Sequence, residues 1–124
     1  MDVEACARRS RERRLGLIDN WLRHVEAIRR RHDDELAALS PEAAVDRLCE
    51  LNVIEQARHV CDTTVVHDAW ARRQRVAVHG WIYGLSDGRL RDLGFAATRH
   101  DEVEAAYERA VNSSTARQIS FDAI

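Results

Sequence analysis

The stretch Val76–Leu93, VAVHGWIYGLSDGRLRDL, predicts a β-hairpin in a chain whose other segments favour helix. Successive residues of a strand point to opposite faces. Here both sets are largely apolar: Val76, Val78, Gly80 and Ile82 on one side, Ala77, His79, Trp81 and Tyr83 on the other. Gly84–Gly88 supplies the turn, and a second short strand follows around Arg89–Leu93. A strand that is apolar on both faces is typical of an α/β sheet with helices on both sides.

Length and charge allow one compact domain and exclude a general attraction to polyanions. The chain has 124 residues, and its charges nearly cancel, giving a net charge of −2. The arginine run Arg8–Arg14 could bind phosphate, but a solvated helix face is the simpler interpretation, so we expect neither a nucleic-acid nor a membrane partner. The three cysteines, Cys6, Cys49 and Cys61, lack CxxC spacing, which favours reduced thiols and a cytoplasmic location.

Helix signals occupy most of the remaining chain. Val3–Arg14 has helical composition, and Ser40-Pro41-Glu42 predicts the start of a helix that runs to about Cys61. Asp62-Thr63-Thr64 should cap a short helix that ends near Ala71. Two apolar sets follow helical spacing. One predicts an amphipathic surface helix after Arg14 with one buried stripe: Leu17, Ile18, Trp21, Leu22, Val25 and Ile28. The other belongs to the long helix that starts at Pro41: Val45, Leu48, Cys49, Leu51, Val53, Ile54, Ala57 and Val60. The second set is wide, which predicts cover on more than one side. A last helix is expected at Asp101–Val111, followed by a frayed tail at 112–124.

Four segments, in this order and spacing, resemble the second half of a β-class carbonic anhydrase. They are Gly16–Leu22 (GLIDNWL), Leu48–Gln56 (LCELNVIEQ), Asp68-Ala69-Trp70, and His79–Gly84 (HGWIYG) followed by Asp87-Gly88 and Leu90–Leu93 (LRDL). The resemblance implies an α/β fold class, with residues 1–111 forming the C-terminal portion of a β-carbonic anhydrase domain. This portion would consist mainly of helices plus one terminal hairpin, with the central parallel strands missing. The hairpin would then supply the last parallel strand and an antiparallel edge strand.

The same resemblance implies a zinc enzyme that hydrates carbon dioxide to bicarbonate and whose subunits pair closely. The family takes its zinc ligands from Cys-x-Asp-x-Arg and His-x-x-Cys segments, and this sequence contains neither; Val3 stands three positions before Cys6. We therefore expect no catalytic, cofactor-binding or metal-binding residue in this chain, and no activity of the chain alone. The alternative is a non-catalytic module that pairs with a full-length homologue or with a separately encoded N-terminal half.

Other side chains with chemical potential are predicted to be structural. His59, Cys61, Asp62 and His67 are close in sequence, but residues two apart on a helix project about 200° apart, so His59 and Cys61 cannot share one ion. Cys61 is expected to be a small buried residue, and His59 and His67 to lie on the surface. His79 should have a packing role, Trp81 and Tyr83 should form core or subunit contacts, and Asn52 and Gln56 should be partly buried with hydrogen-bond partners.

Overall fold

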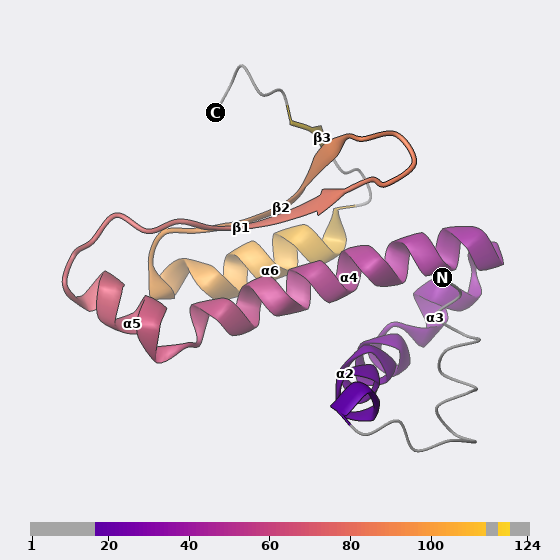
Figure 1. The fold of residues 1–124 in the computed structure, drawn as a ribbon, viewed down its shortest axis with the longest axis horizontal. Helices are drawn as coiled ribbons and strands as arrows, with labels where there is room; N and C mark the ends of the chain where they lie inside the picture. The colour runs from indigo at the N-terminus through magenta and orange to yellow at the C-terminus, as the bar shows by residue number, and fades with distance from the viewer. Residues whose placement is uncertain (1–16, 114–116, 120–124) are drawn as a thin grey trace. The chain divides into compact units, whose positions relative to one another are not determined.

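The computed structural model describes residues 17–113 and 117–119 (Figure 1). The chain divides into two compact units, Met1–Asn52 and Val53–Ile124. The helix predicted at Val3–Arg14 lies outside the described residues. Within them, no helix is both long and apolar enough to cross a bilayer. The elements follow in this order: α2 Leu17–Arg31, α3 Asp33–Ala37, α4 Pro41–Cys61, α5 Thr64–Ala71, β1 Val78–Tyr83, β2 Leu90–Ala97, η1 His100–Glu102, α6 Val103–Asn112 and β3 Arg117–Gln118.

The first unit holds α2, α3 and the first half of α4. Leu22, Val25 and Ile28 are buried along one side of α2, which confirms the amphipathic helix. Leu17 and Ile18 were expected to continue the buried stripe, and that prediction is wrong: their side chains are 86% and 55% exposed. Both lie in the first turn, where helical side chains lean toward the N-terminus and so extend beyond the start of the helix.

The start of α4 agrees with the sequence prediction. Pro41 is the first helical residue, and the backbone N–H of Ala43 donates to Ser40 Oγ at 3.3 Å, as an N-cap should. The wide apolar set of this helix is buried only in part. Cys49 and Val60 are exposed, which corrects the prediction for these two positions. The buried stripe is narrower than predicted: Leu48, Leu51, Ile54 and Ala57, each three residues after the one before, form one continuous buried side.

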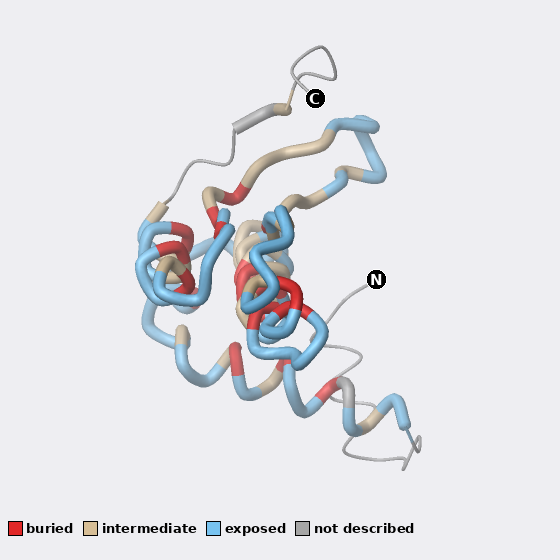
Figure 2. The backbone as a smooth tube through the Cα atoms, turned by 90° about the vertical axis from the view of Figure 1, so that its left-hand side faces the viewer, coloured by how far each residue is buried: buried red, intermediate tan, exposed pale blue. Residues whose placement is uncertain are grey.

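In the second unit β1 and β2 form the predicted antiparallel hairpin. The pairing runs from Tyr83 opposite Leu90 to Val78 opposite Ala97. The second strand was expected to end near Leu93, but it continues to Ala97, since Phe95 and Ala97 are both fully buried and are held by pairing with β1. The turn residues 85–89 are exposed throughout (Figure 2), and the N–H of Gly84 closes the turn by donating to the carbonyl of Arg89 at 2.8 Å.

Gly80 allows the hairpin to approach its neighbours. The strand register shifts between His79 and Trp81: Gly80 alone on β1 lies opposite Leu93–Phe95 of β2, so the irregularity is a bulge on β2, where Gly94 has a φ of +86°. A Cβ at this position would lie 3.2 Å from the Cβ of Phe95 and 3.9 Å from that of Ala57. Because glycine has no Cβ, it leaves space here for β2 and for the second half of α4.

The core of this unit lies between one face of the hairpin and two helical segments, the Val53–Cys61 part of α4 and α6. Its buried members are Ile54, Ala57, Cys61, Leu93, Phe95, Ala97, Val103, Ala106 and Ala110. On β1, His79 and Tyr83 are exposed, as is Ala96 on β2. In the described part of the chain, helices therefore cover the hairpin on one face, forming two layers (Figure 1).

Part of the predicted tail adds a third strand. Arg117 and Gln118 form β3, which pairs antiparallel with Asp92 and Arg91 of β2. The strand order is β1-β2-β3, so β2 is central rather than the edge strand that the resemblance implied. The N–H of Ile119 donates to the carbonyl of Leu90 at 2.9 Å, which satisfies a backbone group on the side of β2 that would otherwise be open. The proposed division at residue 111 stays a prediction.

Candidate functional site

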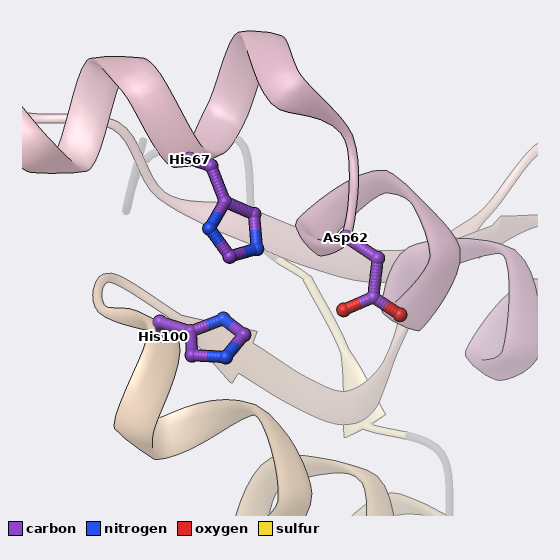
Figure 3. Close-up of side chains that lie close together, drawn as sticks. All are labelled: Asp62, His67 and His100. Atoms are coloured by element: carbon purple, nitrogen blue, oxygen red, sulfur yellow. The ribbon is translucent and has the colours of Figure 1, made fainter.

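Three side chains of types that ligate metal ions lie close together on the surface of the second unit: Asp62, His67 and His100 (Figure 3). Each offers one ligand atom, and these atoms all lie within 4.8 Å of one another. The residues come from three segments, namely the junction between α4 and α5, helix α5 itself, and the first position of η1. All three are exposed, so the cluster is open to solvent.

The N-terminal cap of α5 fixes the positions of Asp62 and His67. Thr63 is the N-cap: its Oγ1 accepts from the N–H of Val66 at 3.5 Å and donates to the carbonyl of Val60 at 2.7 Å. The N–H of His67 donates to the carbonyl of Thr63 at 3.0 Å. Asp62 lies directly between the end of α4 and this cap, so the same hydrogen bonds set its position relative to His67.

Glu102 holds the segment that carries His100. Its carboxylate accepts from the backbone N–H of Thr98 at 2.8 Å and from Thr98 Oγ1 at 3.0 Å. These bonds lower the pKa of Glu102, with Arg99 contributing a smaller part. The closed loop from Thr98 to Glu102 contains His100 at the start of η1, and the imidazole ring of His100 lies against that of His67, with the ring centroids 4.4 Å apart and the planes tilted by 50°.

Only two of the three residues of this cluster were identified from the sequence. Asp62 and His67 were candidates, but they were grouped with His59 and Cys61, and the structure separates those two. His59 Nε2 lies 3.6 Å from Glu55 Oε1 of its own helix, and Cys61 is fully buried, as predicted. His100 was missed because it follows a strand far along the chain, where no spacing rule relates it to α5.

The described thiols do not fit a zinc-thiolate site of the family type. Burial raises the pKa of the Cys61 thiol, and the neighbouring Asp62 carboxylate raises it further. Partial desolvation also raises the pKa of Cys49, with the carboxylates of Asp46 and Glu50 adding to the effect. Zinc binds the thiolate, and both environments disfavour that form. Neither cysteine belongs to a group of three or more potential metal ligands among the described residues.

The remaining candidates have structural surroundings. His79 contacts Trp81 with ring centroids 5.2 Å apart, in keeping with a packing role. Tyr83 is 56% exposed, so it is no core residue of the described chain. Asn52 Oδ1 and Trp81 Nε1 are buried without a hydrogen-bond partner among the described residues, contrary to the expectation for Asn52, and Gln56 is exposed. The Arg8–Arg14 run lies outside the described part.

Comparison with known proteins identifies the family. A family model for carbonic anhydrase matches residues 2–90. The chain belongs to the carbonic anhydrase family. Among curated relatives, a carbonic anhydrase of Emericella nidulans is 41% identical over 80 residues, or 64% of this chain, and one of Pseudomonas aeruginosa is 33% identical over 97 residues, or 73%.

A solved structure confirms the resemblance to the β class. The structure of the Coccomyxa β-carbonic anhydrase in complex with acetazolamide matches 73% of this chain, with 33% sequence identity and a TM-score of 0.66. The chain covers 40% of that structure, 35% of the Emericella protein and 43% of the Pseudomonas protein. It therefore corresponds to part of a β-carbonic anhydrase, mainly helical and with one small antiparallel sheet.

Proposed function

We propose that this chain does not hydrate carbon dioxide on its own, although it belongs to a family of carbonic anhydrases. The observation that carries the proposal is the sequence itself, which contains no Cys-x-Asp-x-Arg and no His-x-x-Cys segment. The raised pKa values of the Cys49 and Cys61 thiols support it, since neither is prepared to bind a metal as thiolate. The residues present thus do not fit the zinc centre that the family implies.

A stopped-flow assay of carbon dioxide hydration tests this proposal. The purified chain, with and without added Zn²⁺, is expected to hydrate carbon dioxide no faster than buffer. A full-length relative such as the Pseudomonas aeruginosa carbonic anhydrase provides the positive control under the same conditions. Zinc-dependent turnover of the chain above the buffer rate, removed by a chelator, would overturn the proposal.

The second candidate is a pairing module that associates with a homologous subunit or with a chain that carries the N-terminal half. One observation favours it: β1 ends the strand order β1-β2-β3, so its outer edge has no strand partner among the described residues. An open strand edge presents backbone N–H and C=O groups that another strand can pair with. Tyr83 lies exposed on this same strand, where a partner could cover it.

Light scattering coupled to size-exclusion chromatography measures this association. The chain is expected to elute as a dimer or larger assembly, and Tyr83→Arg should shift it toward the monomer by placing a charge on β1. Leu85→Arg is the matched control, because Leu85 is 93% exposed in the turn beyond the strand. A monomer at all concentrations, alone and mixed with a full-length homologue, would contradict the pairing role.

We also infer a cytoplasmic location from the cysteines. Cys49 and Cys61 are both free thiols, as expected for a protein kept in a reducing compartment. Titration of the unfolded chain with a thiol reagent should therefore find all three cysteines reduced in protein isolated without reductant. Recovery of a disulfide-linked form would contradict this inference.

A further inference from the structure

We propose that Asp62, His67 and His100 form a surface site for a divalent transition-metal ion of the Zn²⁺ type. The site is unrelated to the ligand segments of the family, contains no cysteine, and does not depend on the proposed lack of hydration activity. It departs from the expectation that this chain contains no metal-binding residue, which rested on the absence of the family's ligand segments and on the spacing of His59 and Cys61.

The donor set and its geometry favour zinc. Two imidazole nitrogens and one carboxylate oxygen are ligands that Zn²⁺ binds readily, at about 2.0–2.2 Å. Tetrahedral ligands at such bond lengths lie about 3.4 Å from one another. The three donor atoms of the cluster are already within 4.8 Å, and small rotations of exposed side chains can close the difference. Figure 3 shows the two rings and the carboxylate directed into one shared space.

The side chains are available for a ligand. Among the residues that the structure describes, Asp62, His67 and His100 form no side-chain hydrogen bond or ion pair. The only contact recorded for these described side chains is the one between the imidazole rings of His67 and His100. The guanidinium next in sequence to His100 is engaged elsewhere, since Arg99 lies 3.2 Å from Glu102 and 3.6 Å from Asp101. Among the described residues, Arg99 therefore does not compete for the Asp62 carboxylate.

The surrounding hydrogen bonds prepare the site. Thr63 fixes the junction between α4 and α5, and Glu102 fixes the Thr98–Glu102 loop, so each backbone segment is held before an ion arrives. Such preorganisation lowers the conformational cost of binding. A bound ion would link the start of α5 to η1, two segments that are far apart in the sequence, and would stabilise the folded unit by mass action.

Titration with Zn²⁺ followed by NMR of the imidazole signals tests the proposal directly. The chain has six histidines, and one equivalent of Zn²⁺ is expected to shift the signals of His67 and His100 while His59 stays unchanged. The melting temperature should rise with Zn²⁺ concentration. Acidification should release the ion, because the metal and the proton compete for the imidazole nitrogen.

Variants separate this site from adventitious binding. His67→Ala and His100→Ala should each weaken Zn²⁺ binding at least about tenfold, because loss of a group that merely supports a ligand already costs about that much, and Asp62→Asn should weaken it less. His59→Ala is the matched control: His59 is exposed and close in sequence to Asp62, but lies outside the cluster, so binding should not change. Far-UV circular dichroism checks that each variant folds.

Two results would overturn the proposal. One is Zn²⁺ binding by His67→Ala and His100→Ala that equals binding by the unmodified chain. The other is binding that blocks thiol modification of the cysteines and leaves the His67 and His100 signals in place. Both would assign the ion to other residues of the chain, whatever the outcome of the hydration assay.

Discussion

The two units of the chain are stabilised in different ways. In the first unit, ion pairs join Arg29 to Glu26 and Asp33 within three or four residues, and Arg47 of α4 to Glu50 and to Glu35 of α3. In the second unit the core joins the Val53–Cys61 part of α4, strand β2 and α6, which are far apart in sequence. The second unit therefore depends on a buried core built from distant segments, whereas the first combines a helical stripe with ion pairs, of which those of the 35% exposed Arg29 contribute little individually.

Truncation of Phe95 should have the largest effect on stability. Phe95 is fully buried between the hairpin and the helices. It packs against Gly80, where an added Cβ would lie 3.2 Å from the Cβ of Phe95. Phe95→Ala should lower the free energy of unfolding by about 4 kcal/mol, through lost burial and the cavity that remains. Chemical denaturation measures this change. Leu85→Ala, in the exposed turn, is the control and should change stability little.

Truncation of Ile28 tests the first unit in the same way. Ile28 is 1% exposed on α2, and Ile28→Ala should cost about 3 kcal/mol. Ile18→Ala on the same helix is the matched control, because Ile18 is 55% exposed and little apolar burial is lost. If Ile28→Ala destabilises the chain more than Phe95→Ala, the proposed difference between the units is wrong.

The sequence predicted the local features of both units and missed the distant ones. Two helix starts were predictable because adjacent residues determine them: Ser40 with Pro41 for α4, and Thr63 for α5. The glycine-rich turn in the same way determines the hairpin. The bulge in β2 opposite Gly80, the extension of β2 to Ala97 and the position of His100 beside His67 depend on packing between segments far apart in sequence. Helical periodicity also could not show where a buried stripe ends, which is why Ile18 and Val60 were placed incorrectly.

A hydrogen bond between helices should have a smaller effect. Tyr107 Oη of α6 donates to Glu55 Oε2 of α4 at 2.9 Å, and Glu55 is only 5% exposed. Tyr107→Phe removes this bond to a buried carboxylate and should cost about 2 kcal/mol, in the range for hydrogen bonds to charged groups. Tyr83→Phe is the control, since Tyr83 is exposed on β1. An equal effect of the two variants would show that the contact between α4 and α6 contributes nothing specific.

Acid sensitivity should give the smallest effect and should occur in both units. Hydrogen bonds from Arg29 lower the pKa of Glu26, and hydrogen bonds from Thr98 lower that of Glu102. A carboxyl group whose folded pKa lies below its ordinary value of 4.5 stabilises the protein above that pH, and the contribution is lost as pH falls through the folded pKa. Glu26→Gln and Glu102→Gln should therefore reduce the loss of melting temperature between neutral pH and the range below 4.5.

The Glu102 variant also separates two roles of one loop. Because Glu102 holds the Thr98–Glu102 segment that carries His100, Glu102→Gln should weaken Zn²⁺ binding as well as flatten the acid dependence, whereas Glu26→Gln should affect the acid dependence alone. Glu108→Gln, on the exposed side of α6, is the control for both measurements. Unchanged Zn²⁺ affinity in Glu102→Gln would mean that His100 binds the ion without support from the loop. The claim that Glu102 preorganises this segment would then be wrong, whereas the assignment of Asp62, His67 and His100 as ligands would not be affected.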